Sequence, residues 1–294
     1  MNYVVVTPAR NEAAFIENLI QSMLAQTVKP LRWVIVSDGS TDGMDDIVKR
    51  HAERNPWITL LRMPERKVRH FAGKVHAFNA GYSAVKDLAF DAIASLDADL
   101  TFEPDYFEFL LGKLAADASL GLVGTPFEEE GRSYDYRFTS IEHVSGACQL
   151  FRRRCFEDIG GYVPMEGGGI DHVAVLTARM KGWHTRTFTE KKSQHHRKQG
   201  TANRSLLRDK YRIGTLDYRL GGHPLWEVFR AFYQLGKPPV ILGGIWLFCG
   251  YFSCWLRRAP RPISAELVEF RQREQKARLR KLFGLGSAAG TATR

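Results

Sequence analysis

Two aspartates one residue apart, Asp97 and Asp99, end an apolar run in the stretch "IASLDADLTF". Like charges at neighbouring positions on one face of a strand repel each other, so the pair needs water or a counter-charge. An isolated D-x-D pair is commonly a solvated turn. At the end of a central strand, a divalent cation such as Mg²⁺ or Mn²⁺ resolves the repulsion and completes its shell with water and phosphate oxygens. The pair therefore predicts a metal site that holds a diphosphate-bearing ligand.

Two earlier apolar runs also end in polar turns. The turn "TPARNE" carries Pro8, Arg10 and Glu12, and "VSDGSTDG" carries Asp38. Asp38 can accept a hydrogen bond from a base N–H or a ribose hydroxyl, or it can serve only as a turn residue. No G-x-G-x-x-G follows the first strand and no G-x-x-x-x-G-K-[ST] occurs, which disfavours a dinucleotide-binding dehydrogenase and excludes a P-loop NTPase.

Alternating strand and helix patterns must position these turns. Short apolar runs predict strands at residues 3–9, 31–38, 57–63 and 90–99, separated by helical patterns at 11–26, 44–53 and 72–86. This alternation predicts an α/β fold with a doubly wound, mainly parallel sheet. In such sheets ligands bind beyond the carboxyl ends of the strands, where all three polar turns fall.

The charge distribution divides the chain near residue 190. Residues 1–190 hold 21 Lys and Arg against 26 Asp and Glu, a net charge of −5, whereas residues 191–294 hold 21 against 6, a net of +15. A hydrophobic content of 44% excludes global disorder. We expect a catalytic domain at 1–190, a basic and aromatic helical connector at 191–236, and a membrane-associating segment at 237–294. The basic third suggests a polyanionic partner, either a membrane surface or nucleic acid.

The ordered series of motifs resembles the inverting family 2 glycosyltransferases with the GT-A fold, of the membrane-associated type. The series covers about two-thirds of the chain and comprises "TPARNE", "VSDGSTDG", "GKVHAFNAGYS", "SLDADLTFEPDYF", "GACQLFRRRCFEDIGGY" and "GGGIDHVAVLTARMKGW". The resemblance implies a nucleotide-diphospho-sugar donor and a divalent metal. It also implies transfer of the sugar to a lipid-linked or cell-surface polysaccharide acceptor.

The resemblance assigns expected roles to individual residues. The implied nucleotide-sugar contacts are Pro8, Arg10, Glu12, Asp38, Lys74 and Asp97. Arg10 stands where the family often has Tyr, and a guanidinium can also stack on a base. The implied metal ligands are Asp99, Asp97 and either His195 or His196 from the charge run "KKSQHHRKQG", which by itself is typical of a solvated loop.

Inversion requires a base that deprotonates the acceptor hydroxyl. We expect this base to be Asp171, which opens a helix after the glycine-rich "EGGG", with Glu166 as the reserve candidate. A helix N-terminus favours the ionised carboxylate that a base requires. The alternative is that Asp171 only caps the helix.

The basic third contains an uncharged segment of 19 residues, 238–256. A helix of that length spans roughly 28 Å, against a hydrocarbon core of about 30 Å. A single crossing would export the Arg-rich tail against the positive-inside tendency, so we expect a peripheral or monotopic anchor on the cytoplasmic face of the membrane. A single span, a buried helix and an oligomer interface stay open. The N-terminus has no signal-peptide pattern, which favours the cytoplasm for the catalytic part.

The sequence therefore predicts a metal-dependent inverting glycosyltransferase. We expect no nucleic acid among its partners. The processive Q-x-x-R-W motif is absent after the last strand, which favours the addition of a single sugar. Two alternatives remain, a nucleotidyltransferase on a related fold and a non-enzymatic basic adaptor that binds membrane or nucleic acid through its tail.

Overall fold

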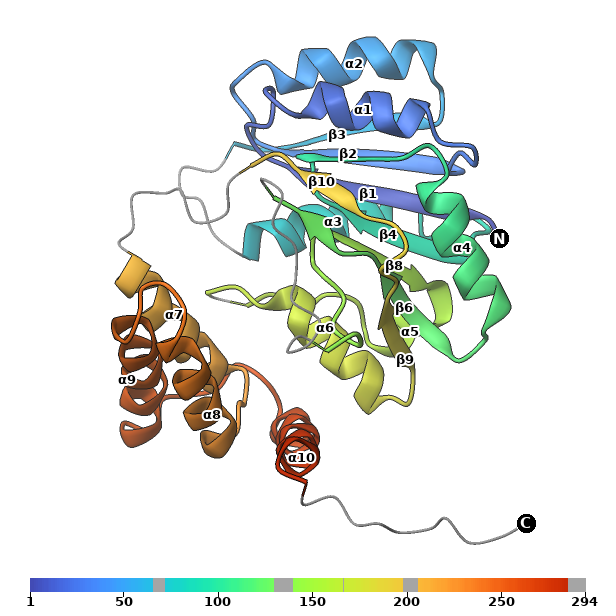
Figure 1. Ribbon diagram of the computed structural model, residues 1–294. Coiled ribbons are helices and arrows are strands. Elements are labelled where there is room, and N and C mark those ends of the chain that lie inside the picture. Colours follow the sequence, from blue (N-terminus) through green and yellow to red (C-terminus); the bar gives the residue numbers. More distant parts are fainter. Residues whose placement is uncertain (66–71, 130–139, 166, 198–205, 285–294) are drawn as a thin grey trace, which may run out of the picture. The chain divides into compact units, whose positions relative to one another are not determined.

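The computed structural model describes residues 1–65, 72–129, 140–165, 167–197 and 206–284 (Figure 1). The chain forms two compact units, Met1–Gln199 (unit 1) and Gly200–Arg294 (unit 2). The finer division expected at residues 190 and 236 stays a prediction. Glu166 lies outside the described residues.

A seven-stranded sheet forms the centre of unit 1. Its order is β3–β2–β1–β4–β8–β6–β9, and all neighbours are parallel except β8, which runs antiparallel to β4 and β6. In that order the strands are Ile58–Met63, Arg32–Asp38, Tyr3–Ala9, Ala92–Leu96, Cys148–Arg152, Leu120–Gly124 and His184–Thr187. The expected mainly parallel α/β sheet with a helical C-terminal region is confirmed.

A second, three-stranded sheet begins directly after Asp99. It consists of β5 (Leu100–Phe102), β10 (Ser193–His195) and β7 (Phe127–Glu128), with β10 in the middle. The antiparallel register opposes His195 to Leu100. This pairing brings the histidine pair of the charge run next to the D-x-D turn, although nearly a hundred residues separate them in sequence.

Helices cover both faces of the large sheet (Figure 1). One face carries α1 (Ile16–Leu24), α2 (Met44–Arg54) and α4 (Tyr106–Ala116). The other carries α3 (Ala72–Ser83), α5 (Arg153–Asp158) and α6 (Ile170–Met180). Because both faces are buried, the strands need apolar residues at every position, which explains uninterrupted runs such as "YVVV".

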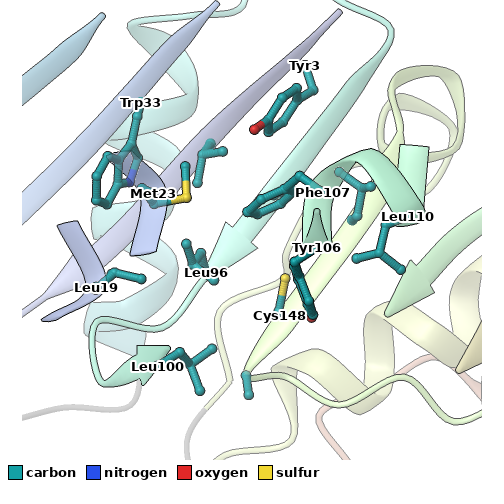
Figure 2. Close-up of a cluster of buried hydrophobic side chains, with 14 of the residues drawn as sticks. Tyr3, Leu19, Met23, Trp33, Leu96, Leu100, Tyr106, Phe107, Leu110 and Cys148 are labelled. Atoms are coloured by element: carbon teal, nitrogen blue, oxygen red, sulfur yellow. The ribbon is translucent and has the colours of Figure 1, made fainter. Parts of the chain in front are cut away.

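The core shows this two-sided burial residue by residue. In β1, Tyr3 and Val5 pack into the cluster under α1 and α4, while Val4 and Val6 pack under α3. Figure 2 shows the first cluster, in which Trp33 of β2 lies beside Met23 of α1 and Tyr3 of β1 lies beside Phe107 of α4. Its indole Nε1 donates to Thr7 Oγ1 over 2.9 Å, so the buried N–H is satisfied. This packed sheet fixes the carboxyl ends of β1, β2 and β4.

Unit 2 consists of α7 (Leu206–Arg219), α8 (Pro224–Leu235), α9 (Leu242–Leu256) and α10 (Ala265–Leu282). Glycines allow α7 and α9 to approach closely, since a Cβ on Gly214 would collide with the Leu247 carbonyl and one on Gly250 with the Tyr211 carbonyl. Within the described part of the chain, none of the helices has both the length and the apolar character needed to cross a bilayer.

Candidate active site

The turns after β1 and β2 are fixed to each other. Asn11 adopts a left-handed φ of 56°, a conformation that Asn tolerates better than most residues. Its backbone N–H donates to Ser40 Oγ (3.0 Å), and its side-chain oxygen accepts from the Thr41 N–H (2.9 Å). The neighbours of these residues, Glu12 and Asp38, are both buried. Pro8 lies within β1, and Arg10 directly follows the strand and is half-buried.

Asp97 lies beyond the end of β4 and pairs with Lys74 of α3. Lys74 Nζ donates to Asp97 Oδ1, and the Asp97 N–H donates to the Ala147 carbonyl over 2.9 Å. Burial raises the pKa of the Asp97 carboxyl, with a further contribution from Asp99 and against the pull of Lys74. Burial acts to lower the pKa of Lys74, but the charges of Asp97, Asp171 and Asp99 outweigh it and raise that pKa. The lysine therefore stays charged in an acidic surrounding.

Asp99 faces a different set of partners. Its Oδ1 lies 3.5 Å from His195 Nε2 and its Oδ2 lies 3.8 Å from Arg197 Nε. The neighbouring His196 points its ring to Thr101 instead, with Nε2 2.8 Å from the hydroxyl, and its backbone N–H donates to the Asp99 carbonyl. Of the two histidines considered from the sequence, His195 is thus the one whose ring faces Asp99.

Asp171 lies in the first turn of α6, after Gly169 at φ 87°. It lines a pocket together with Lys74, Val75, Phe78, Ser95, Gly146, Tyr162 and Ile170. A Cβ on Gly146 would come within 2.8 Å of the Asp171 carboxylate, so glycine is what allows the carboxylate to lie there. The expected base and Lys74 are therefore brought together at one pocket.

The donor atoms around Asp99 are compatible with a metal ion. Among the described residues, no group of three His, Cys, Asp or Glu side chains is close enough to hold one. Asp99 is only 10% exposed, yet both contacts of its carboxylate are longer than an ordinary hydrogen bond. His195 Nδ1 is buried with no hydrogen-bond partner in the described structure. That nitrogen lies 3.9 Å from Glu129 Oε2, while Nε2 is the ring nitrogen on the side of Asp99. A carboxylate and an imidazole are both donor types that divalent cations accept.

Two residues that position Asp171 were not expected from the sequence. Gln149, fully buried in β8, donates through Nε2 to the Asp171 carbonyl (3.4 Å) and to the Val144 carbonyl (3.1 Å). The Tyr162 hydroxyl donates to Gln149 Oε1 over 2.6 Å. A polar residue inside the apolar run "GACQLF" is the sequence signal that points to such a role. Arg197 was also missed, because it lies within a run of exposed-looking charges.

The mainly parallel α/β fold of unit 1 is of the GT-A type. Residues 4–164 match the family described as Glycosyl transferase family 2, and because this is more than half of the chain, the chain belongs to that family. The family and the expected class of enzyme, a glycosyltransferase, are thereby confirmed. The membrane-associated type and the inverting mechanism stay predictions.

Sequence relatives are considerably longer than this chain. It is 30% identical over 118 residues to the chondroitin synthase of Pasteurella multocida (strain Pm70), a match that covers 40% of this chain and 11% of that protein. It is 25% identical over 170 residues to the poly-β-1,6-N-acetyl-D-glucosamine synthase of Staphylococcus aureus (strain COL), covering 51% and 39%. The chain thus corresponds to less than half of these relatives.

Solved structures share the fold at low identity. The mannosyltransferase PcManGT from Pyrobaculum calidifontis, in complex with GDP-Man and Mn²⁺, superposes with a TM-score of 0.58 at 20% identity, covering 95% of this chain and 80% of that one. TarS 1–349 of S. aureus, in complex with UDP-GlcNAc, gives a TM-score of 0.55 at 14% identity and covers 86% and 72%.

Proposed function

We propose that this chain is an inverting glycosyltransferase that moves a sugar from a nucleotide-diphospho-sugar to a lipid-linked or cell-surface polysaccharide acceptor. The observation that carries the proposal is the convergence of Lys74, Asp97, Asp99 and Asp171 beyond β4, beside an open pocket. Family membership favours this function over a nucleotidyltransferase or a non-enzymatic adaptor. The names of the sequence relatives, both polysaccharide synthases, support the acceptor class.

In the proposed reaction, Asp171 accepts the proton of the acceptor hydroxyl as that oxygen attacks the anomeric carbon. The new glycosidic bond forms on the face opposite the leaving group, and the bond between the anomeric carbon and the diphosphate oxygen breaks. Gln149 and Tyr162 hold the start of α6, so the Asp171 carboxylate is presented in a fixed position. Lys74 supplies a positive charge close to the carboxylates, where negative charge develops on the leaving diphosphate.

Asp99 and His195 are the residues that we expect to hold a divalent metal, with Asp97 as a further candidate. When bound, the metal supplies positive charge that stabilises the diphosphate leaving group. Pro8, Arg10, Glu12 and Asp38, at or just after the ends of β1 and β2, are the residues that we expect to contact the nucleoside.

The proposal is tested by incubating the full chain with UDP- and GDP-sugars, with and without Mn²⁺, and measuring release of the nucleoside diphosphate. Metal-dependent release from at least one donor is expected. The anomeric configuration of the first-formed sugar, read by NMR, should be inverted relative to the donor. If no donor stabilises the protein against heat or is turned over, the proposal is wrong, since a ligand at about 100 times its dissociation constant adds roughly 2.7 kcal/mol to stability.

We further propose that unit 2 attaches the enzyme peripherally to the cytoplasmic face of a membrane. One side of α9, named here the α9 apolar face, presents side chains that are between 41% and 72% exposed: Leu242, Ile245, Trp246, Phe248, Trp255 and Leu256. The exposed Arg257 and Arg258 follow immediately. Apolar and Trp side chains flanked by cations suit the interface of an anionic bilayer.

Vesicle flotation tests this attachment. The protein is expected to float with phosphatidylcholine vesicles that contain phosphatidylglycerol and to float less when the anionic lipid is omitted. The double variant Ile245→Glu/Phe248→Glu should stay in the dense fraction. The control Leu31→Glu, at an exposed apolar residue of unit 1, should float like the wild type. Equal flotation of both variants would remove the α9 apolar face as the attachment site.

A further inference from the structure

One guanidinium in unit 1 is shared by two carboxylates from distant parts of the chain. Arg197, two residues after β10 ends, forms an ion pair through Nη2 with Glu12 Oε2, and its Nε lies 3.8 Å from Asp99 Oδ2. The guanidinium also lies 5.3 Å from the centre of the Phe15 ring. The Arg197 side chain is 32% exposed, whereas both carboxylates are 10% exposed.

This arrangement joins the two halves of the expected donor site. Glu12 belongs to the turn expected at the nucleoside, and Asp99 is the candidate metal ligand. Two carboxylates so little exposed are costly without a nearby cation, and Arg197 supplies that charge to both. The contact with Asp99 is much the weaker of the two, because 3.8 Å is too long for a hydrogen bond.

A guanidinium is equally suited to a carboxylate and to a phosphate, since its five N–H donors form a fixed fork that both anions can accept. A divalent cation on Asp99 would repel the guanidinium and compete for the same oxygen. A nucleotide diphosphate arriving with that cation would in turn offer the guanidinium new anionic oxygens. Arg197 can thus weaken metal binding when no nucleotide is bound and support it when the nucleotide diphosphate is present.

We infer, resting on the proposed function, that Arg197 is a donor-site residue that couples metal binding to nucleotide binding. Before the donor binds, Arg197 neutralises Glu12 and Asp99 and competes with the metal. When the donor binds, Asp99 passes to the metal and the Arg197 guanidinium contacts the diphosphate. Metal and nucleotide therefore load together.

Isothermal titration separates the two parts of this inference. In Arg197→Ala, Mn²⁺ alone should bind about two- to fivefold more tightly than in the wild type, the range that corresponds to the loss of a partly exposed ion pair. UDP or GDP titrated in saturating Mn²⁺ should bind about tenfold more weakly, since a hydrogen-bonded charge pair is lost. Arg197→Lys keeps the charge without the fork and should fall between the two proteins.

Two further variants serve as controls for these titrations. Lys192→Ala removes a neighbouring cation that pairs with Glu128, and it should change neither titration. If Arg197→Ala does not fold, Arg197→Gln serves as the uncharged variant. Unchanged Mn²⁺ affinity together with unchanged nucleotide affinity would reduce Arg197 to a surface ion pair and overturn the inference. If the wild type binds neither UDP nor GDP, the proposed function fails, while the titration with Mn²⁺ alone still decides whether Arg197 competes with metal.

Discussion

Each unit of the protein holds a cluster of acids and bases, and the two clusters are built differently. The site in unit 1 combines Lys74 with Asp97, Asp99 and Asp171 beside an open pocket. The charge cluster of unit 2 comprises Asp217, Glu227, Arg230 and Arg271. There Asp217 Oδ1 accepts from Arg271 (2.5 Å) and lies 3.0 Å from Arg230, which also binds Glu227 over 3.0 Å.

The two clusters differ in the balance of positive and negative charge and in access to a pocket. Arg271 also donates to the carbonyls of Asp217 (3.1 Å) and Leu220 (2.8 Å), so its guanidinium is held on several sides. Asp99, by contrast, is buried with two long contacts. In unit 2 two arginines balance two carboxylates, although Asp217 Oδ2 and Glu227 Oε1 have no hydrogen-bond partner within the described residues. In unit 1 three carboxylates surround one lysine, and Lys74 and Asp171 line a pocket that a ligand can enter. The unit 2 cluster is therefore expected to contribute stability and the unit 1 cluster activity.

The largest expected effect is on the rate of donor hydrolysis in Asp171→Asn. The amide cannot accept a proton, so turnover should fall by about 10²–10⁴-fold, the usual contribution of a general base. The unfolding temperature and UDP or GDP affinity should stay near those of the wild type. Asp209→Asn, which changes an acid in the first turn of α7, is the matched control. The expected alternative, that Asp171 only caps the helix, is wrong, because Gly169 is the N-cap of α6 and no side chain caps it. A rate that stays near the wild-type value would mean that Asp171 is not the base.

Arg271→Ala is expected to have the next largest effect, and it acts on stability. Removing one partner leaves Asp217 and Glu227 buried with less compensation, which typically costs about 3–5 kcal/mol. Urea unfolding followed by Trp fluorescence measures the loss. Arg273→Ala, at an exposed position of the same helix, should stay within about 0.5 kcal/mol of the wild type. Equal midpoints for the two variants would contradict a stabilising cluster.

The sequence predicted the sheet well because its signal is local. Uninterrupted apolar runs such as "YVVV" reflect burial on both faces and appear directly in the chain. The antiparallel direction of β8 could not be predicted from the sequence, because an apolar run looks the same whether its strand is parallel or antiparallel to its neighbours. The local sequence does not predict the short strand β10 either, because its three residues form a strand only by pairing with β5 and β7.

The candidate site was predictable where residue type and strand end coincide, as at Asp97 and Asp99. Arg197 was not, because its partner Glu12 lies 185 residues away and nothing in the run "HHRK" distinguishes a paired cation from a solvated one. The choice between His195 and His196 required the register of β10, which directs the two rings to different partners. The contacts of Arg197, His195 and His196 depend on pairing with residues far away in the sequence, which the local sequence does not show.

The smallest expected effect, counted over one pH unit, is a pH dependence that marks the unit 2 cluster. Burial, with a further contribution from Asp217, raises the pKa of Glu227 from 4.5 to about 8 against the attraction of Arg230. Between these two values the folded protein binds a proton that the unfolded chain releases, so stability is greatest at low pH and falls as pH rises, by at most about 1.4 kcal/mol per unit. The pKa of Asp217 is lowered by Arg271 and Arg230 despite its burial, so its own contribution is lost only in more acidic solution.

Urea unfolding at intervals from pH 5 to pH 8 tests this prediction in Glu227→Gln, where the amide has the shape of the protonated acid and does not titrate. The slope of stability against pH should be flatter in this variant than in the wild type. Glu266→Gln, at an exposed glutamate in the first turn of α10, should keep the wild-type slope. Identical slopes in all three proteins would mean that Glu227 is ionised throughout, and the unit 2 cluster would then differ from the unit 1 site in access alone, not in how its charges are compensated.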